Sequence, residues 1–190
     1  MHKIGISKKG KKKVKGLTVA LVIGHKKESP GASNKKSKVT EFDFNEPLVK
    51  DVACLLEERS VNVSIVYRDT YRDLPAKINK AKPDLIISFH ANAFNEIASG
   101  TETLYYRGSV KGQEFAEKIQ RAMVQEMKLP NRGCKPRSVD DRGGYLLRYT
   151  NAPCVILEPF FIDNDDNLER AQVKAPDLAE AIADCIYKAY

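Results

Sequence analysis

The sequence predicts a single α/β domain, with a twisted and mostly parallel central sheet that carries helices on both faces. Strand patterns alternate with helix patterns from about residue 17 onward, the order that produces a parallel sheet covered by helices. The first strand pattern, Leu17–Ile23, is an unbroken apolar run, as expected for a strand buried on both faces. With 190 residues and no internal repeat, the chain is long enough for one domain with a sizeable core.

Four more elements are expected in the first half of this domain. After a polar loop, Glu46–Arg59 repeats apolar residues at helical spacing, and Val61–Tyr67 alternates apolar and polar residues like a strand. Thr70–Ala81 is predicted to form a short helix that ends before a Lys-Pro pair, and Asp84–Phe89 is the next strand. These patterns give the βαβ rhythm of a parallel sheet.

The second half continues the same rhythm. Gly100–Tyr106 alternates and is expected to be an edge strand, and Val110–Met127 is a long amphipathic helix. Residues 130–144 are rich in Gly, Pro and charge, which predicts a loop. Cys154–Leu157 is the last strand, and Ala175–Tyr190 has the apolar face of a terminal helix.

Basic charge is concentrated at the start of the chain. Residues 1–16 contain seven of the 32 Lys and Arg residues and no acid, which leaves a body of residues 17–190 with 25 basic and 25 acidic residues. We expect residues 1–16 to be a disordered basic tail, which could also contact an anionic polymer such as teichoic acid, nucleic acid or lipid headgroups. The neutral body lacks an aromatic-interleaved basic surface, so nucleic acid is not expected to be the primary partner.

The basic tail and the apolar run after it superficially resemble a secretory signal. The apolar run is short and the lysine block is long, so we do not expect a signal peptide. No stretch is long enough to span a membrane. We therefore expect synthesis in the cytoplasm.

Three residues that could perform hydrolysis stand at predicted strand ends. His25 follows Leu17–Ile23 after one glycine, His90 follows Asp84–Phe89, and Glu158 follows Cys154–Leu157. The C-terminal ends of parallel strands open onto one crevice, so these side chains should meet there. His, His and Glu are the residue types of a hydrolytic zinc site and its general base. Either histidine alone is more often a hydrogen-bonded loop residue.

A catalytic zinc usually needs a third protein ligand. Glu46 is the favoured candidate because it starts the predicted first helix, after Asn45 as N-cap. Glu41 and Asp43 are competitors that precede this predicted start. Glu46 could instead serve only to stabilise the helix N-terminus.

Glu158 follows a strongly apolar strand and precedes another apolar segment. Partial desolvation should raise the pKa of its carboxyl group, which suits a group that takes and returns a proton. The alternative is a structural Glu158 that is ion-paired with Arg142 or Arg148.

Four short motifs occur in a familiar order. They are Gly24-His25 with Pro30-Gly31-Ala32, then Asn45-Glu46, then Ser88-Phe89-His90-Ala91-Asn92-Ala93, and Leu157-Glu158-Pro159-Phe160-Phe161-Ile162-Asp163-Asn164. Together they resemble the zinc-dependent N-acetylmuramoyl-L-alanine amidases, the cell-wall hydrolases of bacteria and the endolysins of their phages. The resemblance covers about residues 17–190, and Asn131–Gly133 with the last motif looks most like the endolysin branch.

The resemblance implies one zinc ion held by His25, Glu46 and His90, with Glu158 as the catalytic carboxylate. It implies hydrolysis of the amide bond between N-acetylmuramic acid and L-alanine in bacterial peptidoglycan, in wall lysis or remodelling. The turn Lys26–Ser29 departs from the family, in which it is usually glycine-rich with an acid before the Pro-Gly, so loop shape and substrate contacts there are in doubt.

Three rival functions use parts of the same evidence. A zinc peptidase that cuts within the peptidoglycan stem peptide would need the same residues, and only the cleaved bond would distinguish it. A wall-binding module would not need Glu158, and a nucleic-acid binder rests on the tail alone. An amidase of this kind would reach the wall at lysis or as part of a longer protein.

Overall fold

The computed structural model describes residues 16–190. The basic tail predicted for residues 1–16 therefore lies, except for Gly16, outside the described residues. The strands are β1 (Thr18–Ile23), β2 (Asn62–Tyr67), β3 (Leu85–Phe89), β4 (Thr101–Tyr106), β5 (Asn131–Arg137) and β6 (Cys154–Glu158). The helices are α1 (Glu41–Glu58), α2 (Leu74–Lys80), α3 (Val110–Met127), α4 (Gly144–Tyr149) and α5 (Asp165–Ala189).

The strands form one six-stranded sheet in the order β2-β1-β3-β6-β4-β5. β2, β1, β3 and β6 are parallel, β4 is antiparallel to β6, and β5 is parallel to β4. The prediction that residues 100–106 form an edge strand is wrong, because β5 pairs along the outer side of β4. β5 lies in the segment predicted to be a loop, and its Pro136 is tolerated because the strand is at the edge of the sheet.

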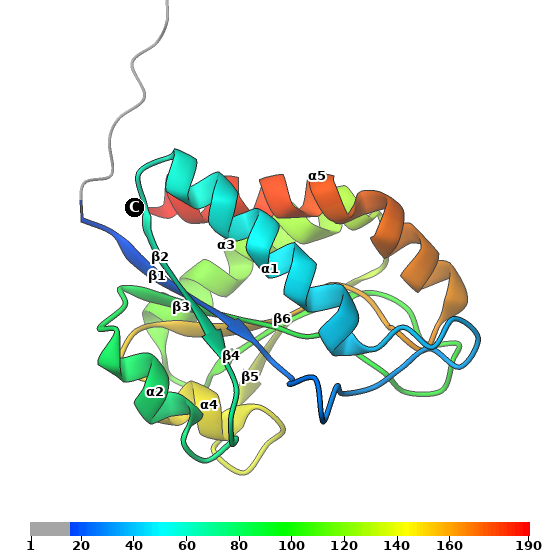
Figure 1. Cartoon of the computed structure of the whole chain (residues 1–190), viewed down its shortest axis with the longest axis horizontal. Coiled ribbons are helices and arrows are strands. Elements are labelled where there is room, and N and C mark those ends of the chain that lie inside the picture. The colour runs from blue at the N-terminus through cyan, green and yellow to red at the C-terminus, as the bar shows by residue number, and fades with distance from the viewer. Residues whose placement is uncertain (1–15) are drawn as a thin grey trace, which may run out of the picture.

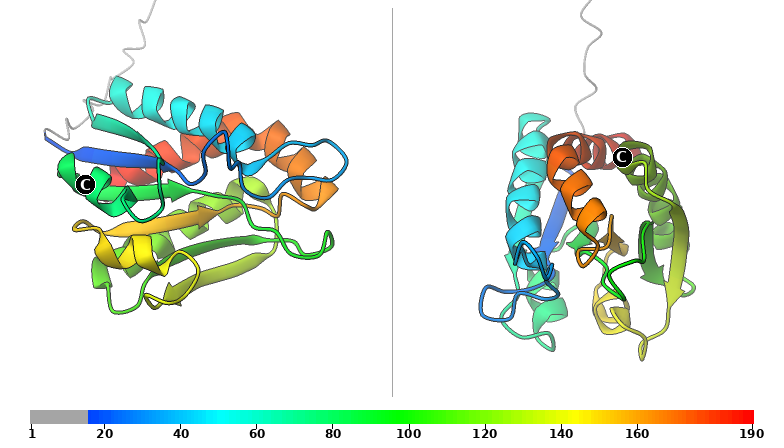
Figure 2. Two further views of the ribbon diagram at one scale, coloured as in Figure 1. Left: turned by 60° about the horizontal axis from the view of Figure 1, so that its bottom comes forward. Right: turned by 90° about the vertical axis from the view of Figure 1, so that its right-hand side faces the viewer.

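Helices cover both faces of the sheet, as predicted. α1, α3 and α5 pack on one face, and the shorter α2 and α4 pack on the other (Figures 1 and 2). The apolar run of β1 is unbroken because the strand is buried on both faces. Val19, Leu21 and Ile23 belong to the core under the three long helices, whereas Ala20 and Val22 belong to the core under α2 and α4. No helix in residues 16–190 is long and apolar enough to cross a membrane.

Two helices begin earlier than the sequence predicted. α1 begins after Thr40, whose side chain accepts a hydrogen bond from the backbone N–H of Asp43 while the Asp43 carboxylate accepts from the N–H of Thr40. This reciprocal capping box satisfies two N–H groups at the helix end. α5 begins after Asn164, whose side chain accepts a hydrogen bond from the backbone N–H of Asn167. The early start of α1 decides which carboxylate enters the site.

Candidate active site

The C-terminal ends of β1, β3 and β6 lie side by side in the sheet, and each supplies a residue of the candidate site. His25 lies two residues after β1, His90 directly follows β3, and Glu158 is the last residue of β6. The sequence prediction that these three residues share one crevice is confirmed, because all of them line one cavity of about 660 Å³.

Glu41, the first residue of α1, stands between the two histidines. Its Oε2 lies 3.4 Å from His25 Nε2 and 3.4 Å from His90 Nδ1. The three atoms all lie within 4.8 Å of one another, so the group could hold a metal ion. Ligand atoms about 2.0–2.1 Å from a tetrahedral ion are roughly 3.3 Å apart. The two distances from Glu41 Oε2 are close to this value and longer than a good hydrogen bond.

Backbone amides fix the orientation of the Glu41 carboxylate. The N–H of Ala32 donates to Oε1 at 2.9 Å, and the N–H of Ala91 donates to Oε2 at 3.1 Å. Burial opposes ionisation of Glu41, but the adjacent imidazoles of His25 and His90 outweigh it and hold the pKa of its carboxyl group well below the usual range. Burial lowers the pKa of His90, against the pull of Glu41. An anionic carboxylate beside a neutral imidazole is the protonation state that binds a metal ion.

Glu46, which the sequence favoured as third ligand, lies elsewhere. Its Oε1 accepts hydrogen bonds from Lys50 Nζ at 3.0 Å and from Tyr67 Oη at 3.1 Å. The physical reason is the helix start: residues advance by about 100° each around a helix, so Glu46 is turned by roughly 140° from Glu41. The structure thus corrects the choice of carboxylate in favour of Glu41. Of the two competitors, Asp43 is used in the capping box.

Glycines let the three side chains approach one another. A Cβ on Gly24 would lie 2.1 Å from His90 Nε2, far inside contact distance. Gly31 has a φ of +85°, and a Cβ there would lie 2.8 Å from both Glu41 Oε1 and His25 Cδ2. The Gly-His and Pro-Gly motifs of the sequence are therefore needed for packing around the site.

Replacing Gly24 by alanine is expected to weaken metal binding although no ligand is changed. The new methyl group would displace the His90 ring, and disturbing the support of a ligand typically costs about 10–100-fold in metal affinity. Competition with a chromogenic chelator measures this. Gln125→Ala, an exposed change on α3, is the control for an added alanine away from the site. An unchanged affinity in Gly24→Ala would contradict this account of the glycine.

Glu158 is buried in the same cavity as His25, Glu41 and His90. Its side chain is 3% exposed, Oε1 lies 3.6 Å from Arg142 Nη2, and Oε2 has no hydrogen-bond partner among the described residues. Burial raises the pKa of Glu158 to about 8; Arg142 lowers it, and the charges of Glu41 and Glu102 add to the rise. The sequence expectation of a raised pKa agrees with this result. Arg142, one of the two expected ion-pair partners, is near but beyond hydrogen-bond distance.

In the metal-free protein, Glu158 is expected to reduce stability as the pH rises. Its pKa is about 8 in the folded protein against an ordinary value of 4.5. Between these values the folded state holds a proton that the unfolded state has released, so the free energy of unfolding falls with rising pH. Urea unfolding from about pH 5 to about pH 8 would compare wild type with Glu158→Gln, which cannot ionise. A difference between the two proteins that does not change with pH would contradict the raised pKa.

A third buried carboxylate, Glu102, was missed from the sequence. It lies directly opposite Glu158 in the β4–β6 pairing and is buried. Asn92 Nδ2 donates to its Oε1 at 3.0 Å, and Arg132 Nε donates to its Oε2 at 2.8 Å. The available signal was an acidic residue inside the alternating pattern of residues 100–106. These partners compensate the Glu102 charge and give Asn92 and Arg132 defined contacts beside the site.

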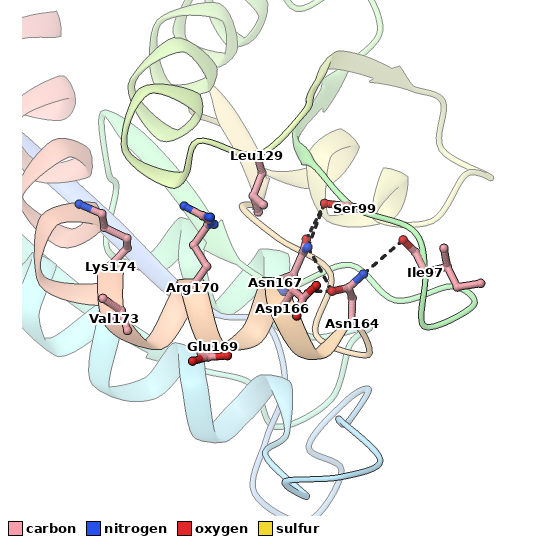
Figure 3. Close-up of a pocket in the computed structure, with 10 residues that line it drawn as sticks. All are labelled: Ile97, Ser99, Leu129, Asn164, Asp166, Asn167, Glu169, Arg170, Val173 and Lys174. Atoms are coloured by element: carbon pink, nitrogen blue, oxygen red, sulfur yellow. Dashed lines mark hydrogen bonds between the residues drawn. The ribbon is translucent and has the colours of Figure 1, made fainter.

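A second hollow, of about 710 Å³, lies at the start of α5 (Figure 3). It contains none of the histidines or carboxylates described above. Three of its polar side chains bind one another, since Asn167 Nδ2 donates to Ser99 Oγ and to Asn164 Oδ1 (Figure 3). These bonds hold the start of the helix in place. The cavity with His25, Glu41, His90 and Glu158 is therefore the candidate active site, although it is slightly smaller.

An α/β domain that gathers a buried glutamate and a His–Glu–His group that could hold a metal ion at one edge of its sheet has the architecture of a hydrolase. Residues 19–189 match the family model described as N-acetylmuramoyl-L-alanine amidase. The chain belongs to this family, as the sequence motifs indicated.

Named relatives and solved structures agree with this assignment. The chain is 30% identical over 185 residues to the N-acetylmuramoyl-L-alanine amidase LytC of Bacillus subtilis, covering 92% of this chain and 36% of LytC. It is 30% identical over 175 residues to an endolysin of Bacillus phage SPP1, covering 87% of this chain and 62% of that protein. An N-acetylmuramoyl-L-alanine amidase structure from Clostridium difficile 630 superposes with a TM-score of 0.80 at 25% identity, covering 90% of this chain and 95% of the other. The chain thus spans about a third of LytC.

Proposed function

We propose that this protein hydrolyses the amide bond between N-acetylmuramic acid and L-alanine in bacterial peptidoglycan, and that it uses one zinc ion. The observation that carries the proposal is the single cavity in which His25, Glu41 and His90 face Glu158. Family membership supports the bond that is cleaved. Wall lysis, as the name of the SPP1 relative indicates for that protein, is the proposed setting.

His25 Nε2, His90 Nδ1 and a Glu41 oxygen would hold the zinc ion, and the spacings of 3.4 Å support this assignment. Three ligands are the usual protein contribution to a catalytic zinc site. A zinc ion there supplies a Lewis acid that polarises the substrate carbonyl and lowers the pKa of water. Ala32 and Ala91 orient the Glu41 carboxylate through their amides.

Glu158 is the proposed proton carrier. Its unpartnered Oε2 is available to accept a proton from the water that attacks the lactyl carbonyl. The same oxygen then returns the proton to the nitrogen of the departing L-alanine, since an amine must be protonated to leave. Burial, which raises the pKa of Glu158, favours a carboxyl group that holds the proton between the two transfers. The products are a glycan strand without its peptide and a stem peptide that begins with L-alanine.

Digestion of purified peptidoglycan tests this function. We expect mass spectrometry to find stem peptides with a new N-terminal L-alanine and no new reducing ends. A chelator should stop the release, and added zinc should restore it. Zinc-dependent cuts inside the stem peptide would mean a peptidase instead. Cleavage that survives thorough metal removal would refute the proposed zinc dependence.

A further inference from the structure

The turn between β5 and α4 holds Arg142 at the rim of the active-site cavity. The N–H of Ser138 donates to Asp141 Oδ2 at 2.6 Å, the N–H of Asp141 donates back to the Ser138 carbonyl at 3.1 Å, and the N–H of Gly144 donates to the Asp141 carbonyl at 2.8 Å. A Cβ on Gly144 would lie 1.8 Å from the Ser138 carbonyl oxygen. The turn therefore closes tightly and needs glycine.

Gly143 fixes the backbone directly after Arg142. Its φ is +82°, in the region that favours glycine, and a Cβ there would lie 2.6 Å from Ile156 Cδ1. Ile156 belongs to β6, two residues before Glu158. The turn is thus packed against the strand that carries the proposed proton carrier, and the position of Arg142 relative to Glu158 is set by the fold.

The Arg142 guanidinium itself is only loosely held. The side chain is 62% exposed, and its contact within the described residues is the 3.6 Å approach to Glu158 Oε1, which is too long for a hydrogen bond. A guanidinium carries five N–H donors in a planar fork that matches a carboxylate. Arg142 therefore presents unused donors inside a cavity that must accept substrate.

Other residues of the same cavity extend this surface. Arg68 lines it with its guanidinium 5.9 Å from the centre of the Tyr71 ring, and the Tyr71 and Tyr145 rings lie 5.8 Å apart. Two acids, Asp140 and Asp141, also line the cavity, and the Asp141 carboxylate accepts a hydrogen bond from Ser138 within the turn. The cavity thus offers two arginines and two tyrosines beside the reacting group, a surface suited to an anionic and partly apolar ligand.

We infer that Arg142 determines substrate specificity by binding a carboxylate of the peptide next to the scissile amide. This inference rests on the proposed function. The lactyl carboxyl group of the sugar is consumed in the scissile amide, so the carboxylate must belong to the peptide. One residue spans about 3.3–3.6 Å, which puts a carboxylate on the residue after L-alanine roughly 7 Å from the scissile bond. An arginine that already approaches Glu158 can reach that distance.

Two synthetic N-acetylmuramoyl peptides test the inference. They differ only in the residue after L-alanine, which carries a free carboxylate in one and a carboxamide in the other. We expect wild type to prefer the carboxylate peptide by about 10–100-fold in kcat/KM, as for hydrogen bonds to a charged group. In Arg142→Gln this ratio should fall toward one, mainly through a higher KM for the carboxylate peptide. Arg121→Gln, an exposed change on α3, is the matched control and should keep the wild-type ratio.

The outcomes separate this inference from the function on which it rests. Equal kcat/KM values for the two peptides in wild type would overturn the role of Arg142 and leave the amidase function standing. A preference that persists in Arg142→Gln with unchanged zinc content would also overturn it. If wild type released an L-alanine-terminated product from neither peptide, the proposed function itself would be wrong, and this inference with it.

Discussion

Glu158→Gln is expected to lose almost all turnover while it keeps the fold and the bound metal. Glutamine has the shape of glutamate but cannot accept the proton of the attacking water or return it to the leaving amine. Positioned proton transfer typically contributes about 10²–10⁴-fold to a rate, and we expect a loss of kcat in that range. His25, Glu41 and His90 are untouched, so the zinc content should stay stoichiometric.

Initial rates on an N-acetylmuramoyl peptide measure this loss, and atomic absorption of the purified variant measures the metal. Glu114→Gln, at an exposed position of α3, controls for the removal of one carboxylate from the protein and should keep wild-type rates. Substantial turnover in Glu158→Gln with full metal content would remove Glu158 from the reaction.

The second large effect separates two glutamates five residues apart in one helix. Glu41→Gln is expected to lose zinc, because an amide is a poor substitute for a carboxylate ligand. The loss of affinity should exceed the roughly 10–100-fold that follows removal of a residue that only supports a ligand. Glu46→Gln should bind zinc like wild type, since Glu46 contacts Lys50 and Tyr67 instead.

Isothermal titration of the two metal-free proteins with zinc gives both affinities. Circular dichroism shows whether each variant has kept its helices. The reverse pattern, in which Glu46→Gln loses zinc and Glu41→Gln keeps it, would restore the ligand that the sequence favoured and reject the geometry described here.

The sequence predicted those site residues whose positions depend on the order of the strands alone. Apolar runs locate β1, β3 and β6, and residues at the C-terminal ends of parallel strands must share an edge, so His25, His90 and Glu158 could be brought together. The third carboxylate depended on a helix start. Proline is typical of the first turn of a helix, and Pro47 lies one position inside the predicted start at Glu46, although the helix begins five residues before that start, at Glu41.

The remaining errors have similar causes. Pro176 lies inside α5 close to the predicted start of that helix, which begins ten residues earlier. β5 carries no long apolar run because it is an edge strand, and its partly buried residues give little pattern to read. The role of Glu102 could not be predicted, because its hydrogen-bond partners, Asn92 and Arg132, are brought near it only by folding. The Thr40–Asp43 pair was the one local signal that could have located the start of α1.

The place of β6 in the sheet determines the order in which the sheet can be assembled. β6 is the last of the six strands in the chain, yet it lies between β3 and β4 (Figure 2, left). The β4–β5 pair therefore cannot join the rest of the sheet until β6 has been synthesised and inserted. Such long-range pairing raises contact order and slows folding. The proposed metal ligands all lie within the first half of the chain, but Glu158 and Arg142 take their positions only with this final insertion. A growing chain would thus contain all three proposed metal ligands well before the proposed proton carrier is in place.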